Sequence, residues 1–505
     1  MKRLLAACAA TVAVVAAGCG AGSGSGAGDP ARLAPAASVA YASFELAPQG
    51  PEKDGFDAAF GKLLGPDPET QIAKGFTDAI KEHGSKLDYE QDVKPWLGDT
   101  AAAVVTGVSR DHPDYAVLVA STNDDKARAA IDKDLEGSGA TSSSYRGVDY
   151  RLLSDGTANA VVDHFLVAGS EAGLKAVVDT SKDGKPLSDT QQWHESVGDR
   201  ADGKIGLAYV DLKALIQTAM SQLPGAQRII APLALGLVQL HPFVATLAAN
   251  ADSLVVDASS PGTPADKRGA GAASSALIES LPADSWGAFA LPGIGQALTK
   301  ITAGLKLNPL IGAQYARVKK QVLRQSGLDL ERDVLAGIGD VAGFVRGTSP
   351  RTVGGGVVVQ ARNRAALKRT VLTLPALIAR SHQVKVRRRG SGFDVTAAHM
   401  PQPIQVRMGG PGVVGAYGGS AMRAALAPSG KLGDAALFRT ASAAIGGRPT
   451  FFAALGPVLD LVRASGHTDP SFAKAAPHLA HLQYAAVGAR REGGTDVIRA
   501  VLGLR

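Results

Sequence analysis

The sequence predicts a mixed α+β protein of two tandem similar units, each a mostly antiparallel sheet with helices packed on one face. Three observations support this fold class. The chain is similar to itself in its two halves, its strand-like apolar runs follow one another between helical segments, and a Pro/Gly/Ser-rich stretch separates the halves. A doubly wound fold would instead alternate strands and helices strictly.

The internal similarity is clearest in one block. Residues 87–99 align without a gap on residues 328–340, at a constant shift of 241. Residues 165–176 match 413–424 further along, so the order of the matches is kept. Two diverged copies of one unit would give such collinear blocks.

The composition indicates where the first copy ends and the second begins. The stretch at 259–275 is rich in Pro, Gly and Ser near its start and has no apolar periodicity, so it is predicted to be a linker. The first copy is then 38–258 and the second 276–505, each near the upper end of ordinary domain size.

Each copy is expected to begin with a short strand, at 39–44 or 285–291, followed by amphipathic helices. In the second copy one helical stripe is predicted to face the core, and it consists of Ile294, Leu298, Ile301 and Leu305. The first copy has the corresponding stripe Ile72, Phe76 and Ile80.

More strands follow the block at 87–99. Apolar strands are predicted at 101–108 and 115–120, and then a helix at 124–135 that Asn123 or Asp124 can cap. Further strands are predicted around 145–153 and 161–167, separated by the turn-forming pair Asp155-Gly156.

The amino terminus has the parts of an export signal. Lys2 and Arg3 precede an apolar run that is too short to span a bilayer, and small residues lead to Cys19. Residues 1–18 are therefore predicted to be a signal peptide, and Ala-Ala-Gly-Cys at 16–19 resembles the lipobox of bacterial lipoproteins. The resemblance implies cleavage before Cys19 and attachment of diacylglycerol to its thiol, with a further fatty acid such as palmitate on the new amino terminus. An ordinary secretory signal cut nearby is the alternative.

Residues 19–37 are expected to be the lipidated cysteine and a flexible tether, because the stretch is made largely of Gly, Ala, Ser and Pro. The chain has 2 cysteines, and Cys8 lies within the predicted signal, so a mature chain could form no internal disulfide. An apolar core must then supply the stability of the fold.

A family resemblance rests on three segments. Asp-Val-Lys-Pro-Trp-Leu-Gly at 92–98, Ala-Ser-Val-Ala-Tyr-Ala-Ser at 37–43 and the lipobox resemble the actinobacterial lipoproteins grouped as domain of unknown function 3352. The resemblance implies a cell-envelope protein of a high-GC bacterium with no assigned reaction. The second copy has Ala336-Gly337 in place of Pro-Trp, so the unit does not require the Trp.

Charge divides the chain unequally. Residues 1–250 have 22 basic and 31 acidic residues, a balance of −9, and residues 251–505 have 31 and 15, a balance of +16. The basic second copy could contact anionic lipid or a wall polymer, could attract the first copy, or could simply present a solvated face. The cations concerned are Arg362, Arg364, Lys368, Arg369, Lys385, Arg387, Arg388 and Arg389. Nucleic acid is not expected as a partner outside the cytoplasm.

No segment carries a catalytic, metal or cofactor signature that outweighs its structural alternative. His478 and His481 have the spacing of two metal ligands but lack others nearby, and the glycine pattern at 410–415 corresponds to a strand in the first copy. Asp88 and Asp92 recur as Asp329 and Asp333, which favours capping over acid–base catalysis. Trp96 is expected to pin its loop to the core.

The uncharged run 229–251 is long enough to span a membrane. It contains Pro232, Pro242, Gln239 and His241, and it is interpreted as buried core instead.

These observations favour a protein held on the outer face of the cytoplasmic membrane by lipid on Cys19. Its leading predicted role is non-enzymatic binding or scaffolding in the cell envelope. The alternatives are a carrier of an apolar ligand such as a lipid, in a cavity at or within the copies, and a hydrolase without a recognisable motif. No cofactor is predicted.

Overall fold

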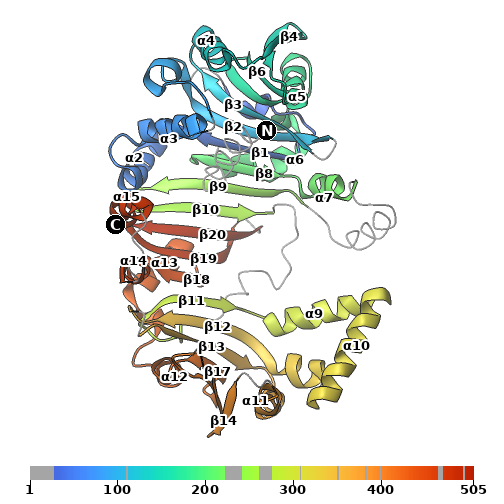
Figure 1. The fold of residues 1–505 in the computed structure, drawn as a ribbon, viewed down its shortest axis with the longest axis vertical. Coiled ribbons are helices and arrows are strands. Elements are labelled where there is room, and N and C mark those ends of the chain that lie inside the picture. The colour runs from blue at the N-terminus through green and yellow to red at the C-terminus, as the bar shows by residue number, and fades with distance from the viewer. Residues whose placement is uncertain are drawn as a thin grey trace. The chain divides into compact units, whose positions relative to one another are not determined.

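The computed structural model describes residues 28–82, 84–109, 112–221, 241–260, 276–307, 309–349, 352–380, 384–398, 400–464, 470–492 and 495–505. The contacts divide the chain into two compact units, of which the first includes Met1–Asp266 and the second Lys267–Arg491. Each unit combines helices with an antiparallel sheet, so the fold is mixed α+β as predicted (Figure 1). The predicted signal at 1–18 and most of the predicted linker, 261–275, lie outside the described residues.

The described residues up to Asp266 of the first unit form ten strands. They are β1 (Ala40–Glu45), β2 (Leu97–Ser109), β3 (His112–Ser121), β4 (Thr141–Tyr145), β5 (Val148–Leu152), β6 (Thr157–Val162), β7 (Phe165–Ser170), β8 (Gly206–Val210), β9 (Phe243–Asn250) and β10 (Ser253–Ser259). Hydrogen bonds place them side by side in the order β4-β5-β6-β7-β3-β2-β1-β8-β9-β10, each antiparallel to its neighbours.

Helices lie between these strands in the sequence. They are α2 (Pro51–Leu64), α3 (Pro68–Glu82), α4 (Asp124–Leu135), α5 (Glu171–Lys182), α6 (Gln191–Ser196) and α7 (Leu212–Ser221), with short helical turns η1 (Pro30–Arg32), η2 (Tyr89–Val93), η3 (Leu187–Asp189) and η4 (Gly198–Ala201). The predicted helix at 124–135 is confirmed, and the Asn123 side chain caps it by accepting from the Lys126 amide.

The second unit has the strands β11 (Ser285–Leu291), β12 (Ile338–Arg346), β13 (Gly354–Ala361), β14 (Lys385–Arg389), β15 (Gly392–Thr396), β16 (Ile404–Gly409), β17 (Gly412–Tyr417), β18 (Pro449–Ala454) and β19 (Leu482–Glu492), and β20 (Thr495–Leu504) is the last strand of the chain. Hydrogen bonds order them as β14-β15-β16-β17-β13-β12-β11-β18-β19, again antiparallel throughout.

The helices of the second unit complete its element order. They are α9 (Ile294–Leu307), α10 (Pro309–Ser326), α11 (Arg364–Ile378), α12 (Gly419–Leu426), α13 (Ala436–Ile445), α14 (Leu455–Ala464) and α15 (Pro470–Leu479), with the turns η6 (Leu330–Val334), η7 (Leu335–Gly337) and η8 (Leu432–Asp434). Through β9 and β19 the two units arrange their strands in the same spatial order, and each places two helices after its first strand.

Helices cover both faces of the first unit's sheet, so the prediction of helices on one face was wrong. Alternate residues of β3 point to opposite sides of the sheet. Leu118 packs in the cluster that holds Leu174 of α5, whereas Val117 and Val119 pack in the cluster that holds Ile131 of α4. The signal that the prediction missed is the long apolar run of β3, which is typical of a strand buried on both faces.

The predicted tether at 19–37 is partly ordered. Residues 19–27 lie outside the described residues, but from Gly28 onward the chain is described, and Ala31, Leu33 and Ala34 are buried in the core of the first unit. Asp29 caps η1 by accepting from the Ala31 amide at 2.9 Å. Composition alone did not reveal this, because Ala and Pro serve equally well in a tether and in a packed turn.

Two predicted strands each contain a turn. The stretch 145–153 includes the turn at Arg146-Gly147 between β4 and β5, and 161–167 includes the turn at Asp163-His164 between β6 and β7. Arg146, Asp163 and His164 have positive φ values, as two-residue hairpin turns require. Asp163-His164 lacks the glycine that usually signals such a turn. The sequence therefore predicted one continuous strand across it.

The uncharged run 229–251 lies partly outside the described residues, and its end forms β9. Within the part of the chain that the structure describes, none of the helices combines the length and apolar character needed to cross a membrane.

Candidate functional site

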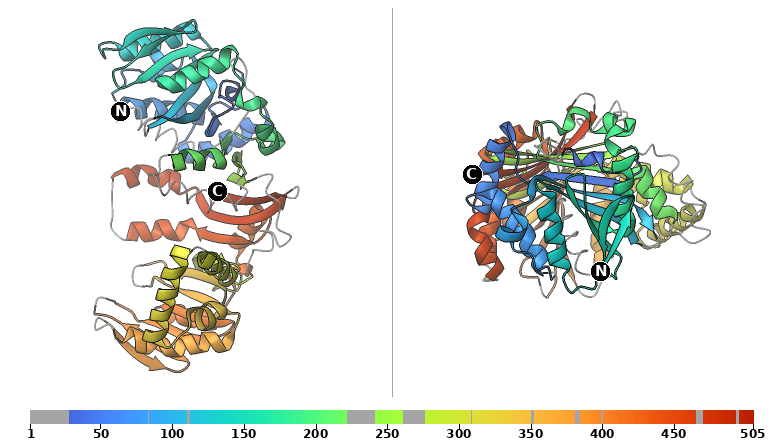
Figure 2. Two further views of the ribbon diagram at one scale, coloured as in Figure 1. Left: turned by 90° about the vertical axis from the view of Figure 1, so that its right-hand side faces the viewer. Right: turned by 90° about the horizontal axis from the view of Figure 1, so that it is seen from above.

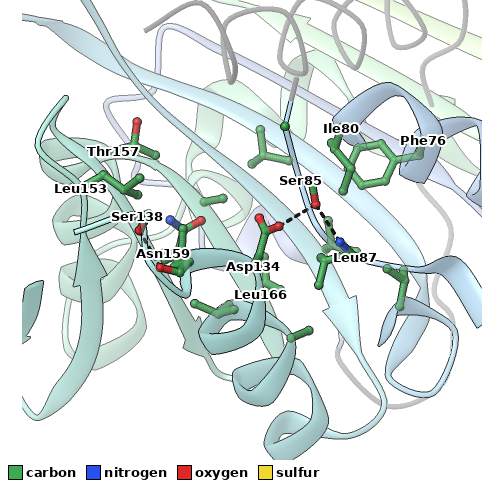
Figure 3. Close-up of a pocket in the computed structure, with 18 of the residues that line it drawn as sticks. Phe76, Ile80, Ser85, Leu87, Asp134, Ser138, Leu153, Thr157, Asn159 and Leu166 are labelled. Atoms are coloured by element: carbon green, nitrogen blue, oxygen red, sulfur yellow. Dashed lines mark hydrogen bonds between the residues drawn. The ribbon is translucent and has the colours of Figure 1, made fainter. Parts of the chain in front are cut away.

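A cavity of about 240 Å³ lies in the first unit, between its sheet and two helices. Phe76 and Ile80 of α3 line one end, and Ile131 of α4 lines another wall. The floor is the sheet, where β3 contributes Val117 and Val119. Figure 3 shows that Phe76 and Ile80 lie at the opposite end of the hollow from Leu153, Thr157 and Asn159. The lining is mostly apolar, as is typical of sites for small organic ligands.

The segment around η2 forms part of the wall, and two aspartates hold its shape. Asp88 accepts hydrogen bonds from the amides of Glu90 and Gln91 at 3.0 and 3.2 Å, and Asp92 accepts from the Asp88 amide at 2.8 Å. Each carboxylate thus satisfies free amides at the start of the turn. The capping role predicted for Asp88 and Asp92 is confirmed.

Trp96 follows this turn and lines the cavity while remaining only 4% exposed. Its indole Nε1 donates to the carbonyl of Asp92 at 2.6 Å. The hydrogen bond fixes the ring, and the prediction that Trp96 pins its loop to the core is confirmed. The ring also presents an apolar surface to the cavity.

Polar contacts join α4 to the segment before η2. Asp134 accepts from the hydroxyl of Ser85 at 2.7 Å and from the amide of Lys86 at 2.8 Å (Figure 3). Ser85 and Asp134 both line the cavity. The carboxylate therefore holds two walls together and is already occupied by protein donors.

Another polar group faces the cavity and has no hydrogen-bond partner among the described residues. Asn159 of β6 is partly buried, and within the described chain its side-chain amide makes no hydrogen bond. Ser138, which also lines the cavity, donates to the carbonyl of Leu135. An amide offers both donors and an acceptor, so Asn159 can bind a polar group on a ligand whose body lies among the apolar residues.

The second unit has an apolar hollow of about 640 Å³ on its own sheet. It is lined by Phe289, Val357, Tyr417 and Phe451 among others, and Phe289 and Phe451 are 38% and 43% exposed. Val357 lies two residues before Val359, which packs in the cluster formed with α11, so both point to the same face of the sheet. This hollow therefore lies on the face that carries α11, as the first unit's cavity lies on the face that carries α4.

The aspartate pair recurs in the second unit. Asp329 accepts from the amides of Glu331 and Arg332, and Asp333 accepts from the Asp329 amide at 2.8 Å. Asp333 is 1% exposed and pairs with Arg332 and Arg369. The guanidinium of Arg332 is the main reason that the pKa of Asp333 falls to about 2. A carboxyl held so firmly ionised is unsuited to proton transfer near neutral pH.

The predicted basic residues do not form one uniform surface. Arg369 pairs with Asp333 at 2.7 Å and Arg389 lies 3.7 Å from Asp394, while Arg388 and Arg364 donate to backbone carbonyls. Ion pairs to described residues are absent for the cations Arg362, Lys368, Lys385 and Arg387.

The remaining predicted candidates are separated or structural. His478 lies in α15, and His481 follows that helix, with its Nδ1 3.3 Å from the carbonyl of Arg505. The described residues contain no group of three or more His, Cys, Asp or Glu side chains that could hold a metal ion. Residues 410–415 form a hairpin turn and the start of the strand β17 rather than a loop before a helix.

The sequence did not reveal the cavity. Its lining comes from α3, η2, β3, α4 and β6, and each residue there has the appearance of ordinary core in its own segment. The cavity exists because the helices lie at a distance from the sheet, and no residue type in the sequence indicates that distance.

Comparison with known proteins gives one family. A family model described as "Protein of unknown function (DUF3352)" matches residues 4–460. No curated protein matches the chain. Two solved structures are similar to part of it at a low level: "Structure of crystal form I of TP0453", with 11% identity, a TM-score of 0.25 and coverage of 46% of this chain and 77% of that one, and "Structure of crystal form III of TP0453", with 10% identity, a TM-score of 0.26 and coverage of 47% and 82%. Likeness at this level does not establish a shared function.

Proposed function

The chain belongs to the family of proteins of unknown function DUF3352, and from this premise we propose that it is a membrane-anchored extracytoplasmic protein that binds an apolar ligand in the cavity of its first unit. The protein acts by binding and catalyses no reaction. This proposal is the more specific of the two binding roles that the sequence suggests.

The cavity is the observation that carries the proposal. Its volume of about 240 Å³ exceeds the roughly 150 Å³ of an engineered apolar cavity that binds benzene in another protein. An apolar void of this size loses dispersion contacts while it is empty, so an apolar occupant stabilises the surrounding fold. A single short chain, or one end of a longer chain, fits this space.

The polar groups restrict the chemistry of the ligand's head. The ionisable residues that line the cavity are Asp134 and Asp155, and both are acidic. A carboxylate or phosphate head would be repelled there, whereas an uncharged head can exchange hydrogen bonds with Asn159. The ligand class is therefore a single-chain amphiphile whose head is uncharged or cationic but not anionic.

The address is part of the same proposal. We propose that residues 1–18 are removed, that Cys19 carries diacylglycerol, and that the protein stands on the outer face of the cytoplasmic membrane. The support is the basic, apolar and small-residue order of residues 1–19. Two or more acyl chains would make the attachment stable.

We also propose that the two units arose by duplication of one. The support is their common order of elements and the two reciprocal aspartate pairs, Asp88 with Asp92 and Asp329 with Asp333. In this view each unit has retained a hollow on the corresponding face, and that of the second unit is the more open. The unpaired cations of α11 and β14 are proposed to contact anionic lipid or a wall polymer.

Three ligands with one tail test the binding site. Dodecanol, dodecylamine and dodecanoate differ only in the charge of the head, and their binding to the purified chain can be measured by calorimetry. We expect dodecanol and dodecylamine to bind and dodecanoate to bind at least about tenfold more weakly than either, because Asp134 and Asp155 repel an anion. Tighter binding of dodecanoate would contradict the proposed head-group chemistry.

A matched pair of variants localises the binding. Ala130 of α4 is buried and lines the cavity, whereas Ala129 of the same helix is exposed. Ala130→Phe places a ring in the cavity and should abolish dodecanol binding, and Ala129→Phe should leave it unchanged. Equal binding by both variants, with folding verified by circular dichroism, would exclude this cavity as the site.

A further inference from the structure

The helix pair α9–α10 of the second unit has an unusual distribution of charge. Between Ile294 and Ser326 every charged residue is a cation, namely Lys300, Lys306, Arg317, Lys319, Lys320 and Arg324. The pair α2–α3, which holds the same place in the first unit, has seven acidic residues and four lysines between Pro51 and Glu82. Helices in the same place in the element order thus carry charges of opposite sign.

The pair also exposes apolar side chains. Ile301 of α9 is 57% exposed, and Val318 and Leu323 of α10 are 52% and 42% exposed. Ile301 belongs to the stripe predicted to face the core, so that part of the prediction was wrong. In α10, Val318 and Leu323 flank the stripe that includes the partly buried Tyr315 and Val322. The apolar face of α10 is therefore wider than the part of it that packs against the protein.

One carboxylate fixes the pair to its unit. Glu331 of η6 lies 2.7 Å from the ammonium of Lys306 in α9 and 3.1 Å from that of Lys319 in α10, and it accepts from the hydroxyl of Tyr315 at 2.9 Å. These contacts hold the pair at the edge of its unit, where Figures 1 and 2 show it beyond the ends of β11 and β12.

The other cations of the pair have no acidic partner in the part of the chain that the structure describes. Lys306 and Lys319 pair with Glu331, and Lys319 also lies 3.4 Å from Asp329, but Lys300, Arg317, Lys320 and Arg324 make no ion pair with any residue in the described ranges. Cations beside exposed Ile, Val and Leu, with no acid on either helix, are typical of helices that lie in the interface of an anionic bilayer.

We infer that the α9–α10 pair binds the surface of an anionic lipid bilayer. Ile301, Val318 and Leu323 enter the boundary between headgroups and acyl chains, and the four unpaired cations contact lipid phosphates. Such a contact would add to an acyl anchor at Cys19 by fixing the orientation of the second unit on the membrane. The inference goes beyond the proposed ligand binding and does not depend on the cavity of the first unit.

A local probe tests this contact independently of any anchor. The chain has 2 cysteines, so Cys8→Ser and Cys19→Ser leave none, and Ile301→Cys then gives a single site for an environment-sensitive dye. Gln71→Cys, at an exposed position of α3, is the matched control in the first unit. The dye reports the surroundings of its own residue, so an apolar run elsewhere in the chain does not produce the signal.

The labelled full-length proteins are mixed with vesicles of phosphatidylcholine alone or with an equal part of phosphatidylglycerol. At residue 301 we expect a blue shift and protection from iodide only with phosphatidylglycerol, and no change at residue 71. Raised salt should reverse the shift, because screening weakens contacts with phosphate. Lys300→Glu, Lys320→Glu and Arg324→Glu together should lower the partition constant on the order of 100-fold.

Three results would overturn the inference. They are full quenching at residue 301 in both kinds of vesicle, an equal response in neutral and anionic vesicles, and equal responses at residues 301 and 71. The salt measurement uses helices with their native charges. It therefore decides whether the contact with the bilayer is electrostatic even if the triple Glu variant does not fold. If the protein did not bind dodecanol but residue 301 were still protected by anionic vesicles, the result would contradict the proposed function and leave this inference intact.

Discussion

The hydroxyl of Ser85 donates a hydrogen bond to Oδ1 of Asp134 across 2.7 Å and so joins the segment before η2 to α4. The two residues lie 49 positions apart in the sequence and together close one side of the cavity (Figure 3). The same carboxylate oxygen also accepts from the Lys86 amide. This one carboxylate therefore makes two of the contacts that hold the cavity walls together.

Asp134→Ala should loosen this side of the cavity. The variant loses both hydrogen bonds and leaves the Ser85 hydroxyl without its acceptor, so we expect the free energy of unfolding to fall by about 1–3 kcal/mol. Urea denaturation followed by circular dichroism measures the change. Asp132→Ala is the control, because Asp132 forms an exposed pair with Arg151 and should cost less than about 1 kcal/mol. Equal losses would show that Asp134 has no special role in the wall.

Gly55→Ala should displace α2 from the sheet. A Cβ at this position would lie 2.2 Å from the carbonyl oxygen of Ala249 in β9, so the helix must move, at a cost of about 1–3 kcal/mol. Gly61→Ala in the same helix is the control. Nothing lies within 4 Å of its added Cβ, and helix propensity should stabilise this variant by up to about 1 kcal/mol. A neutral Gly55→Ala would contradict the close approach.

Glu331→Gln should release α9–α10. The variant weakens the contacts with Lys306 and Lys319, so trypsin should cleave within the pair several times faster than in the native chain. Glu90 aligns with Glu331 in the first unit but is half exposed and pairs with Lys74 and Lys94, so Glu90→Gln should leave cleavage of α9–α10 unchanged. Cleavage sites are identified by mass spectrometry. An unchanged rate for Glu331→Gln would show that other contacts hold the helices.

Acid should weaken the same region. The ammonium of Lys306, followed by the hydroxyl of Tyr315, lowers the pKa of Glu331 from 4.5 to about 2. Because the pKa is lower in the folded state, the contribution of Glu331 to stability is complete above pH 4.5 and is lost as the pH falls towards 2. Urea denaturation midpoints across this interval should fall less steeply for Glu331→Gln than for the native chain. Parallel slopes would assign the acid sensitivity to other groups.

Cys19→Ser should remove the proposed anchor. Without the thiol no diacylglycerol can be attached, so incorporation of labelled fatty acid should disappear. The membrane fraction of the protein should then fall to whatever the remaining contacts retain. Retained label in the variant would contradict lipidation at Cys19. Cys8→Ser is the matched control and should keep the label, because Cys8 lies in the segment that we propose is removed.

The local patterns of the sequence predicted local structure well. The helix Asp124–Leu135 and the strand Ser285–Leu291 were placed from periodicity and capping alone, and the recurrence of Asp88 and Asp92 in the second copy indicated that they cap free amides. Such features depend on residues a few positions apart, so the sequence carries their full cause. The turn at Asp163-His164 was not predicted, because two non-glycine residues adopt positive φ there.

By itself the sequence determined the class of the fold, the position of several of its elements and the excess of positive charge in the second half. The tertiary structure decided which faces those elements share. It placed Asn159 beside an apolar cavity, left Ile301 exposed instead of buried, and neutralised Arg369 with Asp333. The physical reason is that an apolar stripe requires burial but does not specify its partner, and the space between a helix and a sheet depends on contacts between residues far apart in the chain.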